Sequence, residues 1–158
     1  VAGTHFGNVT GLELVESATQ WVLDNITYAP GSTGPVDGAL EAYLRRMGVC
    51  RDSSQLLITF LRARGLPARL VSCYAPGLVP MDFHALTEAL PDGAWYVLDS
   101  TGLAPRSALV RIATGRDAAD TAFLTVQSGR ADLIEVGVQA IVDGDLPVDD
   151  GTSLVQVR

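Results

Sequence analysis

The strongest constraint in this sequence is a change of hydrophobic period near Pro67, which divides the chain into a helix-forming part and a strand-forming part. Before that position, apolar residues recur every three or four positions, a spacing typical of amphipathic helices. After it, apolar residues alternate with other residues, which is typical of strands. Helices that come first and strands that follow indicate an α+β domain, in which an antiparallel sheet is packed against helices.

Two helices are predicted before the first cysteine. The first covers residues 11–28 and ends at the Pro-, Gly- and Ser-rich residues 29–35, which predict a surface loop. The second is short, and we expect Asp37 to cap it and Gly48 to end it. Its apolar stripe would consist of Leu40, Tyr43, Leu44 and Met47.

A third helix is predicted over residues 50–64, so Cys50 stands at a helix N-terminus. Strands are expected over residues 70–75, 82–90 and 94–99. Farther along, two more strands are predicted over 123–127 and 133–142, with a turn between them at 128–130, and an acidic loop over 143–151 precedes a short terminal strand at 154–155.

Length and charge limit the classes of function. A chain of 158 residues fits one domain, residues 1–158. A net charge of −7 offers little to nucleic acid or anionic membranes, so neither is an expected partner. The apolar fraction of 47% excludes disorder and leaves surface for a missing N-terminal domain or a second copy of the chain. The chain begins at Val1 without a targeting segment, and we expect a soluble, cytoplasmic piece of a longer protein.

A Pro-Asp-Gly sequence at residues 91–93 predicts a hairpin that brings a histidine and a carboxylate together. With a two-residue turn, the numbers of paired residues sum to 185, and His84 faces Thr101. Asp99 then projects from the same face as His84 and is its diagonal neighbour. A register slip of one residue would separate the two side chains.

Cys50 adds a candidate nucleophile. A thiolate at a helix N-terminus is favoured by the helix dipole and by free backbone N–H groups. Together, Cys50, His84 and Asp99 supply a nucleophile, a base and an orienting acid in chain order. Each residue also has a purely structural explanation. Cys50 could be a buried structural cysteine, His84 a core histidine with its hydrogen bonds made, and Asp99 a carboxylate that caps a turn.

Several linked motifs resemble the core of the transglutaminase-like superfamily. These motifs are GVCRD at residues 48–52, LRARGLPAR at 61–69, DFHA at 82–85 with Glu88, GAW at 93–95 and LDST at 98–101. A further segment, residues 115–120, is similar to one that follows the core in bacterial members, so the resemblance covers about residues 11–142.

The resemblance implies a papain-like arrangement, in which the cysteine helix packs on an antiparallel sheet, with a catalytic triad of Cys50, His84 and Asp99. It also implies acyl transfer at amide bonds of a protein or peptide through a thioester, without a cofactor or a metal. The backbone N–H of Cys50 is a natural oxyanion donor. Gln20 and Trp21 are weak candidates for a second one.

Several alternatives to an enzyme that cross-links proteins exist, some of which stay open and some of which the sequence disfavours. Hydrolysis, as in a cysteine peptidase or amidase, and cross-linking use the same thioester, and a catalytically silent binding module would keep the fold. A zinc site from Cys50, Cys73, His84 and Asp99 lacks paired ligand spacing. The acidic residues of 143–150 lack the spacing of a calcium loop, so we expect a solvated loop there. Cys73 is expected to be structural; both thiols are expected to be reduced, and a Cys50–Cys73 disulfide stays open.

Overall fold

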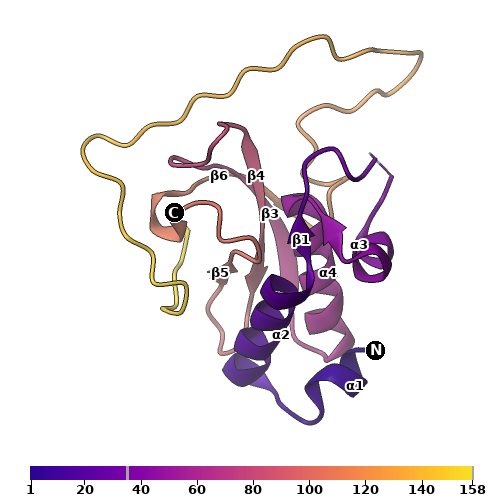
Figure 1. Cartoon of the computed structure of the whole chain (residues 1–158), viewed down its shortest axis with the longest axis vertical. Helices are drawn as coiled ribbons and strands as arrows, with labels where there is room; N and C mark the ends of the chain where they lie inside the picture. The colour runs from indigo at the N-terminus through magenta and orange to yellow at the C-terminus, as the bar shows by residue number, and fades with distance from the viewer. Residues whose placement is uncertain (35, 158) are drawn as a thin grey trace.

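The computed structural model describes residues 1–34 and 36–157, and Figure 1 shows a helical part beside an antiparallel sheet. Pro35, the end of the predicted loop, and Arg158 lie outside the described residues. The helices and the small sheet of the first half are α1 (Ala2–Phe6), α2 (Gly11–Asn25), β1 (Thr27–Tyr28), α3 (Ala39–Arg45), β2 (Met47–Gly48) and α4 (Cys50–Ala63). The predicted α+β class is confirmed.

The second half forms a four-stranded antiparallel sheet in the order β5-β4-β3-β6. Its elements are β3 (Ala68–Tyr74), β4 (Phe83–Ala89), β5 (Tyr96–Leu98), a short 3-10 helix (Arg106–Ala108) and β6 (Val110–Gly115). The predicted hairpin register is confirmed, because the pairs from Thr87↔Leu98 to Ala89↔Tyr96 all sum to 185. The connection is longer than the expected two-residue turn, and β5 ends before it reaches Thr101.

Two apolar cores lie on opposite faces of this sheet. Leu70 and Leu98 belong to one core, with residues of α1, α2 and α4, whereas their neighbours Val71 and Val97 belong to the other. Successive side chains of a strand point to opposite faces, which places the two clusters on opposite sides. The helices cover the first face, and Leu103, Ala104, Leu109 and Val157 contribute to the cover of the second.

Helix α4 is joined to β4 by buried polar contacts as well as by apolar packing. The Ser54 hydroxyl donates to the Ala85 carbonyl at 3.0 Å, and the Thr87 hydroxyl donates to the Ser54 carbonyl at 3.1 Å. Small hydroxyl side chains at this contact let the helix backbone approach the strand closely. This contact fixes α4 along the strand that carries His84.

The predicted second helix is present but differs from its expected form. Gly38, not Asp37, is its N-cap, and the helix ends at Arg45, before Gly48. Asp37 instead accepts a hydrogen bond from the Gly34 N–H at 2.9 Å and pairs with Arg45. The expected stripe is wrong at three of its four positions, since Leu40, Leu44 and Met47 are exposed and Met47 lies in β2, outside the helix.

The two strands predicted over 123–127 and 133–142 are wrong: neither segment forms a helix or a strand. Figure 1 shows this part of the chain as a long orange-to-yellow trace around the outside of the domain. Ile134 is 97% exposed, so the alternating apolar residues have no sheet to pack on. Period-two alternation produces a strand only where a neighbouring strand supplies hydrogen bonds.

Residues 143–151 form a loop that is exposed at most positions, as expected, but one of its aspartates binds back to the fold. Asp149 accepts three hydrogen bonds from the backbone and guanidinium of Arg106, at 2.7 to 2.9 Å. The terminal strand is reduced to one antiparallel bridge between Val155 and Val97 of β5. No helix within residues 1–34 and 36–157 combines the length and the apolar character that crossing a bilayer requires.

Glu88 of β4 is a fully buried carboxylate that connects three parts of the fold. It accepts hydrogen bonds from Arg69 of β3, at 2.7 Å, and from Arg111 of β6. Arg111 also donates to the Val157 carbonyl at 3.0 Å. The Arg69 guanidinium lies over the Trp95 ring, 4.0 Å from its centre.

We expect Glu88→Gln to lower the free energy of unfolding by about 3 kcal/mol, because breaking a buried ion pair leaves its partners uncompensated. Urea unfolding followed by circular dichroism measures this change. Asp132→Asn is the matched control, because the Asp132–Arg130 pair is exposed and we expect no measurable effect there. Equal stability of the two variants would contradict the structural role of Glu88.

Candidate active site

The first turn of α4 is held by Asp52, whose side chain is fully buried. Its Oδ2 accepts from the Val49 N–H at 3.0 Å and from the Thr33 hydroxyl at 2.7 Å, and its Oδ1 accepts two hydrogen bonds from Arg51. Gly48 leaves room for this carboxylate, since a Cβ there would lie 2.9 Å from the Asp52 Cβ. The GVCRD motif therefore builds a capped helix start that fixes Cys50.

Cys50 is the first residue of α4, and its thiol is free and partly exposed. Because α4 begins there, the Cys50 backbone N–H has no partner inside the helix. The helix dipole favours negative charge at this end. A sulfur that solvent can reach, at a helix start, meets the local requirements of a nucleophile.

His84 and Asp99 form a buried pair, as the hairpin register predicts. The His84 Nε2 lies 3.1 Å from the Asp99 Oδ2, and the two side chains are 1% and 3% exposed. The other carboxylate oxygen, Oδ1, accepts from the Thr101 N–H at 2.8 Å and from its hydroxyl at 2.6 Å. Both oxygens are therefore engaged, and the carboxylate has a fixed orientation.

Thr101 was not predicted to donate hydrogen bonds to the Asp99 carboxylate. An Asp followed two residues later by Thr is a turn pattern in which the carboxylate accepts from the backbone, so the signal was present in the sequence. Thr101 holds the carboxylate that in turn holds the imidazole.

The electrostatic balance keeps this pair charged. Burial lowers the pKa of His84, but hydrogen bonding and charge interaction with Asp99 and with Cys50 outweigh it and raise the pKa from 6.5 to about 10. Burial raises the pKa of Asp99, but the hydrogen bond and charge of His84 and the hydrogen bonds from Thr101 hold it below its ordinary value. An imidazolium therefore faces a carboxylate at neutral pH.

The structure brings the three predicted site residues together. The His84 Nε2 is paired with Asp99, and the nearby Cys50 thiol contributes to the raised pKa of His84. The imidazole therefore has the carboxylate at Nε2 and the thiol in its neighbourhood. This geometry suits activation of the thiol by its neighbour; the catalytic role of each residue stays a prediction.

Cys73 lies apart from this arrangement as a buried thiol. Its Sγ is 3.6 Å from the His84 carbonyl oxygen, and it is not bonded to Cys50. Burial, with the charges of Asp99 and Cys50, raises its pKa to about 12. Both thiols are free in the structure and Cys73 is buried, while their redox state and the structural role of Cys73 stay predictions.

Neither predicted candidate for a second oxyanion donor is placed for that role. Trp21 stacks on Tyr43 and packs edge-on against Phe60, in an aromatic cluster toward the C-terminal end of α4. The Gln20 amide donates to Asp24 at 2.8 Å on the same helix. Within residues 1–34 and 36–157, no group of three or more His, Cys, Asp or Glu side chains is arranged to hold a metal ion.

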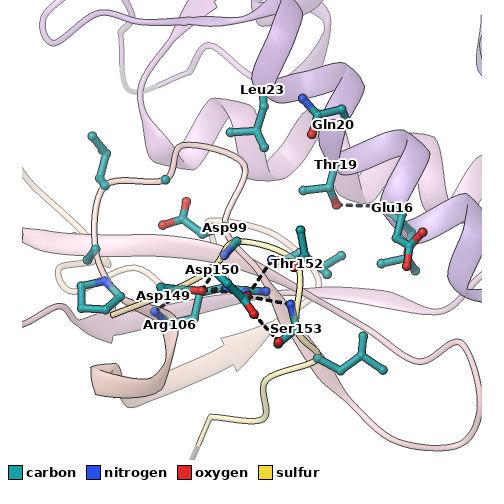
Figure 2. Close-up of a pocket in the computed structure, with 18 of the residues that line it drawn as sticks. Glu16, Thr19, Gln20, Leu23, Asp99, Arg106, Asp149, Asp150, Thr152 and Ser153 are labelled. Carbon is teal, nitrogen blue, oxygen red and sulfur yellow. Dashed lines mark hydrogen bonds and ion pairs between the residues drawn. The ribbon is translucent and has the colours of Figure 1, made fainter. Parts of the chain in front are cut away.

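A cavity of about 930 Å³ lies behind Asp99, between α2 and the C-terminal segment (Figure 2). Of the three predicted site residues, Asp99 is the one that lines it, and Glu16, Asp149 and Asp150 make it acidic. Figure 2 shows Arg106 engaged by Asp149, with Thr152 and Ser153 bonded to Asp150. The cavity lies beside the imidazole–carboxylate pair and not at the sulfur.

The sequence profile described as Transglutaminase-like superfamily matches residues 5–100, which is more than half of the chain. The chain belongs to the transglutaminase-like superfamily. It is also 30% identical over 125 residues to an uncharacterized protein of Mycobacterium leprae (strain TN), covering 73% of this chain and 45% of that protein.

Solved structures share the fold of this superfamily domain. A structure described as a "Putative Cysteine Protease from Cytophaga hutchinsonii" is 43% identical, with a TM-score of 0.74, over 77% of this chain and 42% of that one. A "putative protease" of Parabacteroides distasonis matches at 20% identity and a TM-score of 0.52, over 73% of this chain and 26% of that one, which shows the fold alone. The chain thus spans less than half the length of the first relatives it matches.

The raised pKa of His84 predicts that stability falls with rising pH. The pKa is about 10 in the folded chain and about 6.5 in the unfolded one, so the contribution of His84 is complete below pH 6.5 and is lost as pH rises toward 10. Relative to His84→Gln, the free energy of unfolding of the wild type should fall across this window by up to roughly 1.4 kcal/mol per pH unit. Urea unfolding at several pH values tests this, and parallel pH profiles would contradict it.

Proposed function

We propose that this chain is a cysteine-dependent enzyme that acts on amide bonds of a protein or peptide through a thioester on Cys50. The observation that carries the proposal is the position of His84, a buried imidazole that is paired with Asp99 and lies near enough to Cys50 for that thiol to contribute to its raised pKa. A nucleophile, a proton carrier and an orienting carboxylate in that order are the requirements of covalent acyl transfer.

In the proposed reaction, the Cys50 sulfur attacks the amide carbonyl carbon, and the carbonyl electron pair moves onto oxygen. The tetrahedral intermediate collapses, the C–N bond breaks, and His84 gives its proton to the departing amine. Water, or a second amine, then attacks the thioester while His84 accepts a proton, and the free thiol returns. Asp99 keeps the imidazole in the orientation that both proton transfers need.

We favour hydrolysis over cross-linking as the fate of the thioester. Two features support this choice: the Cytophaga relative, 43% identical, is described as a "Putative Cysteine Protease", and Cys50 is partly exposed. Transfer to an amine requires a site that binds the amine and excludes water. In the longer proteins of this family, segments beyond this domain would contribute to substrate choice.

Acylation by p-nitrophenyl acetate tests the proposal without knowledge of the natural substrate. We expect the transfer of one acetyl group to Cys50, with release of p-nitrophenolate. The reaction should be lost in Cys50→Ala. In His84→Ala the acylation rate should fall by roughly 10² to 10⁴, because the proton carrier is gone. Intact-mass and peptide mass spectrometry locate the acetyl group, and Cys73→Ala is the matched control that should react like the wild type.

The fate of the acetyl group separates the two reactions. Release to water with little transfer to added glycine ethyl ester supports hydrolysis, whereas transfer to that amine supports transamidation. The chain contains arginine but no lysine, so its own side chains offer no amine that would capture the acetyl group. Acylation that is equally fast in the wild type and in His84→Ala would contradict an enzyme and favour a binding module.

A further inference from the structure

The short parallel sheet of β1 and β2 places a tyrosine beside the start of α4. Tyr28 of β1 pairs with Gly48 of β2, two residues before Cys50. The Ala29 N–H donates to the Gly48 carbonyl at 2.9 Å, and the Thr27 N–H donates to the Arg46 carbonyl at 2.9 Å, so the pairing is bonded on both sides of Tyr28. Figure 1 shows β1 beside α4.

The pairing with Gly48 places Tyr28 near Cys50 in the fold, and its side chain is exposed enough to meet a ligand. Burial, then the charges of Cys50 and Asp82, raise its pKa above the ordinary value, which keeps the hydroxyl protonated at neutral pH. The residue is 40% exposed, and within residues 1–34 and 36–157 no hydrogen-bond partner is found for its hydroxyl. A protonated and unengaged O–H near the sulfur can donate to a bound molecule.

Two other tyrosines, unlike Tyr28, have a hydroxyl that is engaged in a hydrogen bond. The Tyr43 hydroxyl is 3.1 Å from the His5 Nε2, and the Tyr96 hydroxyl donates to Asp92 at 3.2 Å. Gln20 and Trp21 are engaged elsewhere, as described above. The Cys50 N–H and the Tyr28 hydroxyl are therefore two candidate donors near the start of α4.

We propose that the Tyr28 hydroxyl is the second donor to the oxyanion that forms when Cys50 adds to a carbonyl group. This inference rests on the proposed function and deepens it. When the sulfur–carbon bond forms, the carbonyl electron pair moves onto oxygen, and the Cys50 N–H and the Tyr28 O–H donate hydrogen bonds to that oxygen. No proton leaves Tyr28, so it acts as a catalytic hydrogen-bond donor and not as an acid.

Binding of a small aldehyde separates this role from nucleophilic reactivity. Acetylglycinal adds reversibly to a thiol to form a hemithioacetal, whose oxygen occupies the oxyanion position. Iodoacetamide instead alkylates the sulfur by displacing iodide at carbon and forms no oxyanion. Because the chain has no lysine, none of its side chains supplies an amine that could form an imine with the aldehyde.

The experiment measures how acetylglycinal protects Cys50 from iodoacetamide in the wild type, Tyr28→Phe and Tyr96→Phe. We expect Tyr28→Phe to bind the aldehyde at least about tenfold more weakly than the wild type, while its alkylation rate without aldehyde is unchanged. Tyr96→Phe loses a hydroxyl of β5 that donates to Asp92 in the loop between β4 and β5, and it should match the wild type in both measurements. The unchanged alkylation rate also shows that the site of the Tyr28 variant is intact.

The role of Tyr28 alone would be overturned by equal aldehyde affinity in Tyr28→Phe and the wild type. It would also be overturned by a wild-type affinity for the aldehyde no greater than that of the glutathione thiol. An alkylation rate that falls together with aldehyde affinity in Tyr28→Phe would also overturn it, because the residue would then act on the thiol and not on the oxyanion. A different result would overturn the proposed function itself, and this inference with it: an alkylation rate of Cys50 by iodoacetamide that is no higher in the wild type than in His84→Ala.

Discussion

The buried pair of His84 and Asp99 is the interaction on which the arrangement of this domain depends. Removing an imidazolium and a carboxylate from water costs several kcal/mol for each ion, and only close pairing with further hydrogen bonds offsets that cost. Thr101 supplies those hydrogen bonds at 2.6 and 2.8 Å. Register between β4 and β5 must therefore be exact to the residue, since a slip of one position would leave both charges buried and unpaired.

Helix α4 brings the sulfur to this pair, and its position is set by polar contacts at its N-terminal half. Asp52 caps the first turn, and Ser54 connects the helix to β4 by donating to Ala85 and accepting from Thr87. Glu88 performs a similar task within the sheet by joining β3, β4 and β6. These buried groups are costly unless paired, so they specify one arrangement of helix and sheet and not merely a compact one.

The sequence predicted the parts of the fold that local patterns determine. The change of period located α2, α4 and the first strands, and the Pro-Asp-Gly turn predicted the register that joins His84 to Asp99. Patterns that depend on a distant partner were not predictable. The alternation over residues 133–142 finds no neighbouring strand, and the Arg106–Asp149 contact joins residues 43 positions apart. Tyr28 was missed because β1 and β2 have two residues each, too few for any periodic signal.

The alkylation rate of Cys50 by iodoacetamide at pH 6 shows whether His84 activates the Cys50 thiol. The thiolate is the reactive form, and an adjacent imidazolium favours it. Peptide mass spectrometry follows Cys50, while Cys73, whose pKa burial raises to about 12, serves as an internal control that stays unmodified in the folded chain. We expect Cys50 to react at least about tenfold faster in the wild type than in His84→Ala. Equal rates in the two folded proteins would contradict it.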